Sequence, residues 1–190
     1  VLILGGSQGA RSINAAMIEA LPRLKHKDRI FLIHQTGDAD EERVRNAVAA
    51  AGIKADVRAF FHDVGNALAR ADLVVCRAGA TTVAELTAIG KAIVFVPFPY
   101  AADDHQTKNA ASLTRRGAAE MINEAELTGE GLAGKIDDFV EHPEALQALA
   151  RQAKQFGRPE AAEAIVDDCL RLLAEKGVWI GEGRTEDHVH

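Results

Sequence analysis

The chain has 190 residues, of which 47% are hydrophobic and 26% charged, a composition typical of one globular domain with a buried core. Its formal net charge of −6 argues against binding nucleic acid through the phosphates. The sequence contains no polybasic patch of the kind that binds membrane surfaces, and its longest apolar runs have only the length of strands. We therefore expect neither a nucleic acid partner nor a membrane span.

Two features bear on the context of the chain. Cys76 and Cys169 are far apart and lack metal-ligand spacing, which predicts two free thiols in a reducing cytoplasm, each packed as a small buried apolar side chain. Residues 1–4 already read as a buried strand, without an initiator Met or a targeting segment before them. We therefore expect the chain to be cut from a larger protein whose missing part lies upstream.

Along the chain, short apolar runs alternate with helical patterns. The runs are residues 1–4, 30–34, 56–60, 73–76, 93–96 and 119–122, and the helical patterns between them are residues 10–24, 39–51, 64–70, 82–89 and 105–116. Strands that are apolar at every position and joined by helical crossovers predict an α/β fold, a Rossmann-like, doubly wound parallel sheet.

Helical patterns alone follow the last predicted strand. They cover residues 128–141, 144–156 and 160–176, after which residues 177–190 are rich in Gly, acidic side chains and His. We predict one Rossmann-like domain over residues 1–176 and a poorly ordered tail over residues 177–190.

Three strand-to-helix turns have unusual compositions. Each follows a predicted strand at its carboxyl end, the edge where open α/β sheets bind ligands. The first, at residues 5–10, reads Gly-Gly-Ser-Gln-Gly-Ala, and its glycines allow the backbone to approach a ligand at a helix N-terminus. It matches neither a Walker loop nor a dinucleotide fingerprint. A tight turn with a serine cap explains it as well as an anion site does.

The second turn, at residues 77–85, reads Arg-Ala-Gly-Ala-Thr-Thr-Val-Ala-Glu. Its small residues open a helix whose first N–H groups can bind a diphosphate, and the carboxylate of Glu85 can accept two hydrogen bonds from a ribose diol. Thr82 and Glu85 also have the spacing of a capping box, which requires no ligand. On spacing alone the capping box is favoured, although the two roles can coexist.

The third turn, at residues 97–106, combines two prolines with Asp103, Asp104, His105 and Gln106. These polar side chains suit the hydroxyl groups of a sugar, and either aspartate can cap the helix that begins near His105. Elsewhere, His34 ends the second strand and is a candidate polar group at the mouth of the site, although a histidine at such an edge is more often structural. Phe60 and Phe61 end the third strand, where an aromatic ring can lie near a flat base, although packing in the core is the default role of a phenylalanine.

Taken together and in order, these motifs resemble the MurG family. The resemblance rests on residues 5–11 (Gly-Gly-Ser-Gln-Gly-Ala-Arg), His34-Gln35-x-Gly37, residues 76–80 (Cys-Arg-Ala-Gly-Ala), Glu85, residues 96–98 (Val-Pro-Phe) and Asp104-His105-Gln106-x-x-Asn109-Ala110. Members of this family transfer N-acetylglucosamine from UDP-N-acetylglucosamine to lipid I, which gives lipid II in peptidoglycan synthesis. The resemblance implies the C-terminal, donor-binding half of a two-domain GT-B glycosyltransferase, and it extends from residue 1 to about residue 176.

The resemblance also implies roles for particular residues. Ser7 would contact the diphosphate, the segment Ala80, Thr81, Thr82, Val83, Ala84 and Glu85 would line the diphosphate and ribose, and Gln106 would bind the sugar. His105 and Gly79 are further candidates beside these. Phe61 falls where the family recognises uracil through backbone groups, although an aliphatic residue is common there.

For the intact enzyme the resemblance implies inverting displacement at the anomeric carbon, with no cofactor, no metal and no catalytic residue in this chain. The missing N-terminal domain would supply the general base, the lipid I site and the membrane contact, at the cytoplasmic face of a bacterial membrane. Two alternatives remain open. The chain is either part of another UDP-sugar enzyme, such as a 2-epimerase, or a donor-binding subunit that needs a separate acceptor-domain protein.

Overall fold

The structure is a computed structural model that describes residues 1–5 and 10–176. The predictions for Ser7 and for a tail at residues 177–190 lie outside these residues. The contacts divide the chain into two compact units, one over Val1–Gly157 and one that begins at Arg158. The first unit contains the whole sheet.

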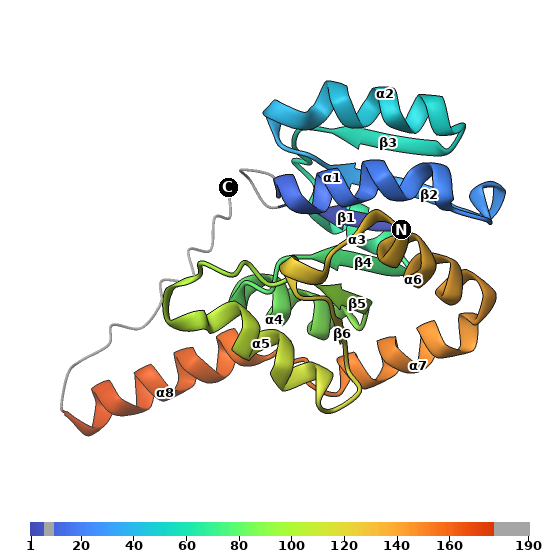
Figure 1. Cartoon of the computed structure of the whole chain (residues 1–190). Coiled ribbons are helices and arrows are strands. Elements are labelled where there is room, and N and C mark those ends of the chain that lie inside the picture. Colours follow the sequence, from blue (N-terminus) through green and yellow to red (C-terminus); the bar gives the residue numbers. More distant parts are fainter. Residues whose placement is uncertain (6–9, 177–190) are drawn as a thin grey trace, which may run out of the picture. The chain divides into compact units, whose positions relative to one another are not determined.

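The first unit is built on a six-stranded sheet in which every pair of neighbours is parallel (Figure 1). The strand order is β3-β2-β1-β4-β5-β6, so the direction of winding reverses between β1 and β4. This arrangement confirms the predicted doubly wound parallel sheet. The strands are β1 (Leu2–Leu4), β2 (Phe31–Gln35), β3 (Lys54–Arg58), β4 (Leu73–Cys76), β5 (Ala92–Phe95) and β6 (Glu120–Met121).

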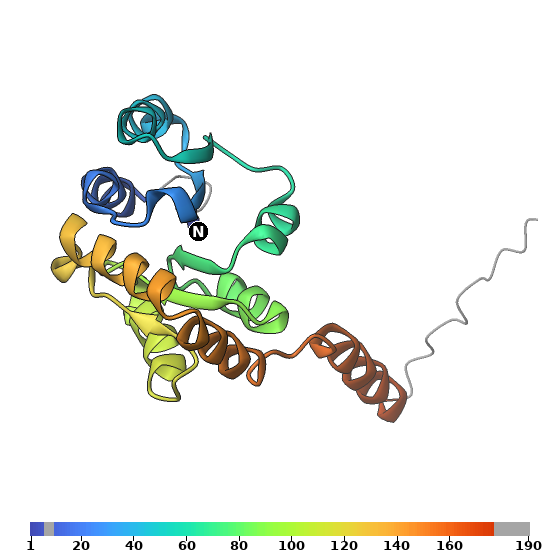
Figure 2. The same ribbon diagram turned by 90° about the vertical axis from the view of Figure 1, so that its right-hand side faces the viewer.

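Helices cover both faces of the sheet, as the edge-on view in Figure 2 shows. On one face, α1 (Arg11–Ala20), α2 (Glu41–Ala51) and α6 (Gly129–Glu141) pack around side chains such as Ile3 and Val75. On the other face, α3 (Val64–Arg70), α4 (Ala80–Ile89) and α5 (His105–Thr114) pack around Leu2 and Val74. Successive side chains of each central strand enter opposite clusters, which explains why these strands are apolar at every position.

Short 3-10 segments and one further helix complete this unit. They are η1 (Leu21–Arg23), η2 (Lys27–Arg29), η3 (Asp38–Asp40), η4 (Ala102–Asp104), η5 (Glu124–Glu126) and α7 (Pro143–Lys154). Pro143 is the first residue of α7, where its missing N–H has no helical partner to lose.

Some predicted boundaries were wrong. β3 was expected at residues 56–60 but runs from Lys54 to Arg58, because the pairing of Phe31 with Lys54 fixes its start. This strand lies at the edge of the sheet, so its polar side chains reach solvent, and the apolar pattern marks it poorly.

In the second unit, the described residues form one helix, α8 (Ala161–Glu175). All of its residues are exposed, including Ile165, Val166 and Leu172. Among the described residues of both units, no helix is long and apolar enough to cross a membrane.

α6 approaches α1 closely at Gly129, the first residue of α6. A Cβ atom added there would lie 2.7 Å from the carbonyl carbon of Glu19 and 2.9 Å from the backbone nitrogen of Ala20. Backbone atoms cannot rotate away as a side chain can, so only glycine lets the two helices meet at this distance.

We predict that Gly129→Ala destabilises the fold by about 1–3 kcal/mol, the usual penalty for overpacking a close contact. Gly134→Ala in the same helix is the matched control, since a Cβ there meets nothing within 4 Å. The control should gain up to about 1 kcal/mol from helix propensity. Urea unfolding of both variants measures the difference, and equal stabilities would contradict the close contact.

Candidate functional site

A cleft of about 240 Å³ opens where the strand order reverses, between the carboxyl ends of β1 and β4. Most of its wall is apolar, and four polar side chains converge on it. The lining residues are Leu4, Gln35, Phe60, Val64, Leu68, Cys76, Arg77, Thr82, Glu85 and Leu86. An apolar slot with a few polar groups at the switch point of an α/β sheet is the usual form of a ligand site in this fold.

A larger hollow, of about 400 Å³, lies at the opposite edge of the sheet near Val1, Phe31 and Leu73. Phe31 and Leu73 begin strands and Val1 directly precedes β1, so the parallel arrangement places the C-terminal ends of the crossover helices at this edge. Free backbone N–H groups and positive helix ends are found at the other edge. We therefore place the candidate site at the smaller cleft.

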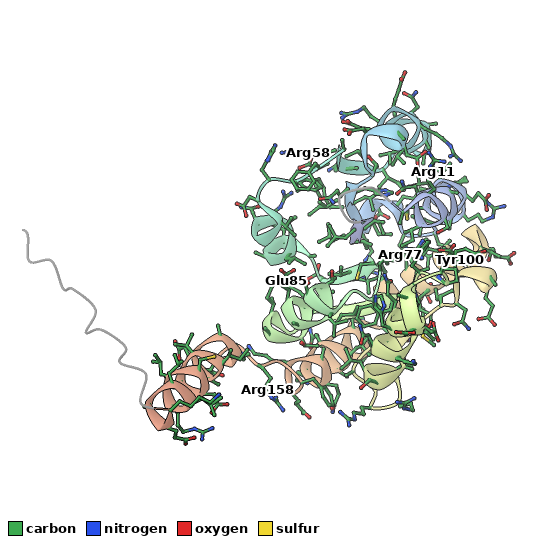
Figure 3. All side chains as sticks on the ribbon, turned by 90° about the vertical axis from the view of Figure 1, so that its left-hand side faces the viewer. Arg11, Arg58, Arg77, Glu85, Tyr100 and Arg158 are labelled. Atoms are coloured by element: carbon green, nitrogen blue, oxygen red, sulfur yellow. The ribbon has the colours of Figure 1, made fainter. Side chains whose placement is uncertain are left out.

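The segment from Gly79 to Glu85 forms the start of α4, and its side chains divide between two directions. Thr82 and Glu85 line the cleft, whereas Val83 packs against the apolar cluster beneath it. Ala80, Thr81 and Ala84 are exposed. Figure 3 shows Glu85 on α4, facing the gap toward α3. In the described part of the chain, Glu85 makes no hydrogen bond or ion pair, so its carboxylate is free to accept from a ligand.

The capping-box alternative for Thr82 and Glu85 was wrong. α4 begins at Ala80, so Thr82 is its third residue rather than its N-cap. The N-cap is Gly79, and no side chain caps this helix among the described residues. The first N–H groups of α4 therefore have no side-chain partner, as at an anion-binding helix N-terminus.

Gln106 is not among the residues that line the cleft, but it joins the second predicted turn to the third. Its Oε1 accepts hydrogen bonds from the backbone nitrogen atoms of Ala78 at 3.3 Å and Phe98 at 3.0 Å. These bonds fix the plane of the carboxamide and leave Nε2 to donate to a ligand hydroxyl. His105 is exposed and its Nδ1 donates to the carbonyl of Ala102 at 2.7 Å.

The aspartates of the third turn do not cap α5 as expected. Asp104 occupies the N-cap position, but its side chain makes no capping hydrogen bond. Asp103 and Asp104 both adopt left-handed backbone angles, with φ of 51° and 53°. Two consecutive non-glycine residues in this region strain the backbone next to the candidate site.

The two phenylalanines after β3 point to different places. Phe60 is 47% exposed and lines the cleft, where a flat ring can lie against it. Phe61 is buried in the apolar cluster, and its backbone nitrogen donates to Oε1 of Gln35 at 3.2 Å. Phe60 is therefore the aromatic side chain of the cleft, and Phe61 contributes only backbone there.

Of the two roles considered for His34, the structure supports the structural one, because the side chain does not reach the mouth of the site. Its side chain is 0% exposed and lies on the face of the sheet covered by α1. Nε2 of His34 donates to Oδ1 of Asn14 at 2.9 Å, because Nδ2 of Asn14 donates at 2.9 Å to both the carbonyl of Thr36 and Oδ2 of Asp40. Asn14 thus joins the first turn of α1 to the residues after β2.

The two cysteines have different surroundings. Cys76 is buried, as predicted, and burial raises the pKa of its thiol to about 12. Cys169 on α8 is exposed, so the expectation that both thiols are buried was wrong for this one. Neither cysteine is in a disulfide. The described residues contain no group of three or more His, Cys, Asp or Glu side chains placed to hold a metal ion.

We predict that the stability of the fold depends on the neutral state of His34. Burial lowers the pKa of His34 to about 4, although the charge of Asp40 acts in the opposite direction. The unfolded chain titrates this group near pH 6.5, so it binds a proton between pH 6.5 and pH 4 that the native state excludes. Neutral His34 therefore contributes to the free energy of unfolding fully above pH 6.5. This contribution is lost as the pH falls toward 4, by about 3 kcal/mol at most.

Urea unfolding at pH 7 and pH 4.5 measures this loss. His34→Gln keeps a donor for Asn14 but does not titrate, so its stability should change less between the two pH values. The same change in parent and variant would show that other groups cause the acid sensitivity.

Comparison with known proteins agrees with this fold. Proteins called UDP-N-acetylglucosamine–N-acetylmuramyl-(pentapeptide) pyrophosphoryl-undecaprenol N-acetylglucosamine transferase are among the most similar. The one from Geobacter sp. (strain M21) is 52% identical over 167 residues, 87% of this chain and 45% of the relative. The one from Myxococcus xanthus is 50% identical over 185 residues, 97% of this chain and 48% of the relative. The chain thus spans about half the length of the curated relatives it matches.

Comparison with solved structures also finds a MurG protein among the similar ones. The crystal structure of Acinetobacter baumannii MurG superposes with a TM-score of 0.81 at 35% identity, over 90% of this chain and 49% of that one. A UDP-GlcNAc 2-epimerase from Neisseria meningitidis shares the fold alone, with a TM-score of 0.63 and 10% identity over 90% of this chain and 43% of that one. The sequence profile of the Glycosyltransferase family 28 C-terminal domain matches residues 1–165. The resemblance inferred from the motifs is therefore confirmed, and the chain belongs to glycosyltransferase family 28, whose C-terminal domain it carries.

Proposed function

We propose that this chain is the donor-binding half of an inverting N-acetylglucosaminyltransferase that makes lipid II from lipid I in peptidoglycan synthesis. The names of the relatives at 50–52% identity support this activity, and the chain matches less than half of each of them. The acceptor site, the general base and the membrane contact then belong to the part of the enzyme outside this chain. The intact enzyme acts at the cytoplasmic face of the membrane.

The observation that carries the proposal is the unpartnered carboxylate of Glu85 on the cleft. A carboxylate repels phosphate but accepts hydrogen bonds from both hydroxyls of a vicinal diol, so Glu85 suits the ribose of a nucleotide rather than its phosphates. Phe60 and the apolar wall beyond it suit the flat base. A cleft of about 240 Å³ has room for a nucleoside, while the diphosphate and sugar extend along the sheet edge.

The diphosphate lies at the start of α4 in this proposal, with Ser7 of the first turn as a further contact. Ala80, Thr81 and Thr82 are the first residues of this helix, and their N–H groups and the helix dipole favour negative charge. Charge grows on the diphosphate as the bond to the sugar breaks, so the same groups stabilise the leaving UDP.

Gln106 and His105 bind the sugar in this proposal, since they follow β5, next to β4 in the sheet. Because Oε1 of Gln106 is held by two backbone N–H groups, its Nε2 is oriented to donate to a sugar hydroxyl. The backbone around Phe61 contacts the base. This chain then binds and orients the donor, and it leaves proton removal from the acceptor to the other half.

The chain should bind UDP and UDP-N-acetylglucosamine more tightly than ATP or NAD. A single carboxylate and a small cleft suit one nucleoside with a diphosphate, and the first turn lacks the Walker and dinucleotide glycine patterns. Calorimetry of the four ligands under one set of conditions measures the preference. Equal or tighter binding of ATP or NAD would remove the proposal that this is a UDP-sugar site.

Glu85→Gln should weaken UDP binding by about ten- to a hundredfold, because the ribose diol loses a charged acceptor. The melting temperature should stay within the error of the parent, since Glu85 has no partner in the described structure and does not cap α4. Glu42→Gln on the exposed face of α2 is the matched control and should leave UDP affinity unchanged. UDP affinity within twofold of the parent for Glu85→Gln would exclude the ribose contact.

A further inference from the structure

Arg77, directly after β4, holds together the edge of the sheet that forms the cleft. Its Nη1 donates to the carbonyl oxygens of Val96 at 3.0 Å and Pro97 at 3.1 Å. Its Nη2 donates to Oγ of Ser12 at 3.0 Å. The guanidinium carbon also lies 5.3 Å from the ring centroid of Phe98. One side chain therefore contacts the start of α1 and the segment after β5.

The charge of Arg77 is paired with that of Glu124 in η5. Ser12 closes the arrangement, because its hydroxyl accepts from Arg77 and donates to Oε2 of Glu124 at 2.8 Å. The side chains of Arg77 and Glu124 are only 17% and 22% exposed, so water screens this pair weakly. We call Arg77, Ser12 and Glu124 the Arg77 clasp. Figure 3 shows Arg77 near the middle of the first unit.

The clasp connects segments that are distant in the sequence. Ser12 belongs to α1, Arg77 to the β4–α4 turn and Glu124 to the residues after β6, while Val96 and Pro97 follow β5. These are the same turns that carry the donor contacts proposed above. Movement of one turn relative to the others must therefore break hydrogen bonds of Arg77.

We propose that Arg77 is a positioning residue for the donor site and does not bind the diphosphate directly. This proposal rests on the proposed UDP-sugar site. An arginine beside a diphosphate would ordinarily be assigned to the phosphates, because its fork suits their oxygen atoms. Here both Nη atoms are already bonded to protein groups, and Glu124 neutralises the charge. Arg77 acts by keeping the turns in the spacing that the donor requires.

Measuring UDP affinity for Arg77→Gln, Glu124→Gln and the double variant separates the two roles. If Arg77 positions the turns, each single substitution breaks the same clasp, so both weaken UDP binding, by about tenfold. The double variant should bind UDP about as well as Arg77→Gln alone. Either single substitution already breaks the Arg77 clasp, so the second substitution removes no further interaction. If Arg77 were a phosphate ligand, Glu124→Gln would release it and tighten UDP binding.

The matched control is the ion pair of Arg45 with Glu41 on α2, because neither residue lines the cleft. Arg45→Gln and Glu41→Gln should leave UDP affinity unchanged. Melting temperatures measure the stability of each variant, and calorimetry at temperatures well below melting measures its UDP affinity. The two measurements together distinguish positioning from a general loss of stability. Variants of the clasp that melt earlier but bind UDP like the parent would overturn the proposal, as would tighter binding by Glu124→Gln or additive losses. If the parent does not bind UDP, the proposed function fails, and the positioning role of Arg77, which rests on it, fails with it.

Discussion

Parallel pairing of β1 with both β2 and β4 is the constraint on which the rest of the structure depends. A parallel strand must be reached through a crossover, so each helix of the sheet begins at the edge where the preceding strand ends. The starts of α1, α4 and α5 consequently gather at one edge, with their unpaired N–H groups and positive dipole ends. The position of the cleft at this edge therefore follows from the topology of the sheet.

Two polar clusters then give this edge its shape. On the α1 face, Asn14 joins α1 to the residues after β2 through His34, Thr36 and Asp40. At the centre of the edge, Arg77 connects the turns after β1, β4 and β5 with the segment after β6. Both clusters replace the water that the buried polar groups would otherwise bind, so each group lost leaves its partners unsatisfied. Site geometry in this chain therefore depends on residues that need not touch a ligand.

The alternation of strands and helices could be predicted from the sequence because buried parallel strands are apolar at every position. Leu73–Cys76 and Val64–Arg70 agree with the prediction at both ends. Edge strand β3 was misplaced by two residues because Lys54, Asp56 and Arg58 face solvent and interrupt the apolar pattern. Strand boundaries were thus predicted better for β4, which is buried on both faces, than for the edge strand β3.

Side-chain roles in the site were harder to predict, since they depend on which residues distant in sequence become neighbours. The role of Glu85 was ambiguous because Thr82 and Glu85 have the spacing of a capping box wherever α4 begins. In the structure α4 begins at Ala80, two residues before Thr82. His34 sits at a strand end, as a site residue would, but points to the α1 face, where Asn14 lies 20 positions before it. The sequence places Arg77 in a turn but indicates no role for its side chain. Its partner Glu124 lies beyond two further strands, so no local pattern connects them.

The contrast between the two cysteines has a practical consequence. Cys76 lies under the cleft and is buried, with the pKa of its thiol raised to about 12, so the reactive thiolate is nearly absent at neutral pH. Cys169 is exposed on α8, in the other unit. A maleimide dye would therefore attach to one known position without any cysteine replacement. Such a fluorophore would report on the surroundings of α8 while the edge of the sheet that forms the cleft stays chemically unmodified.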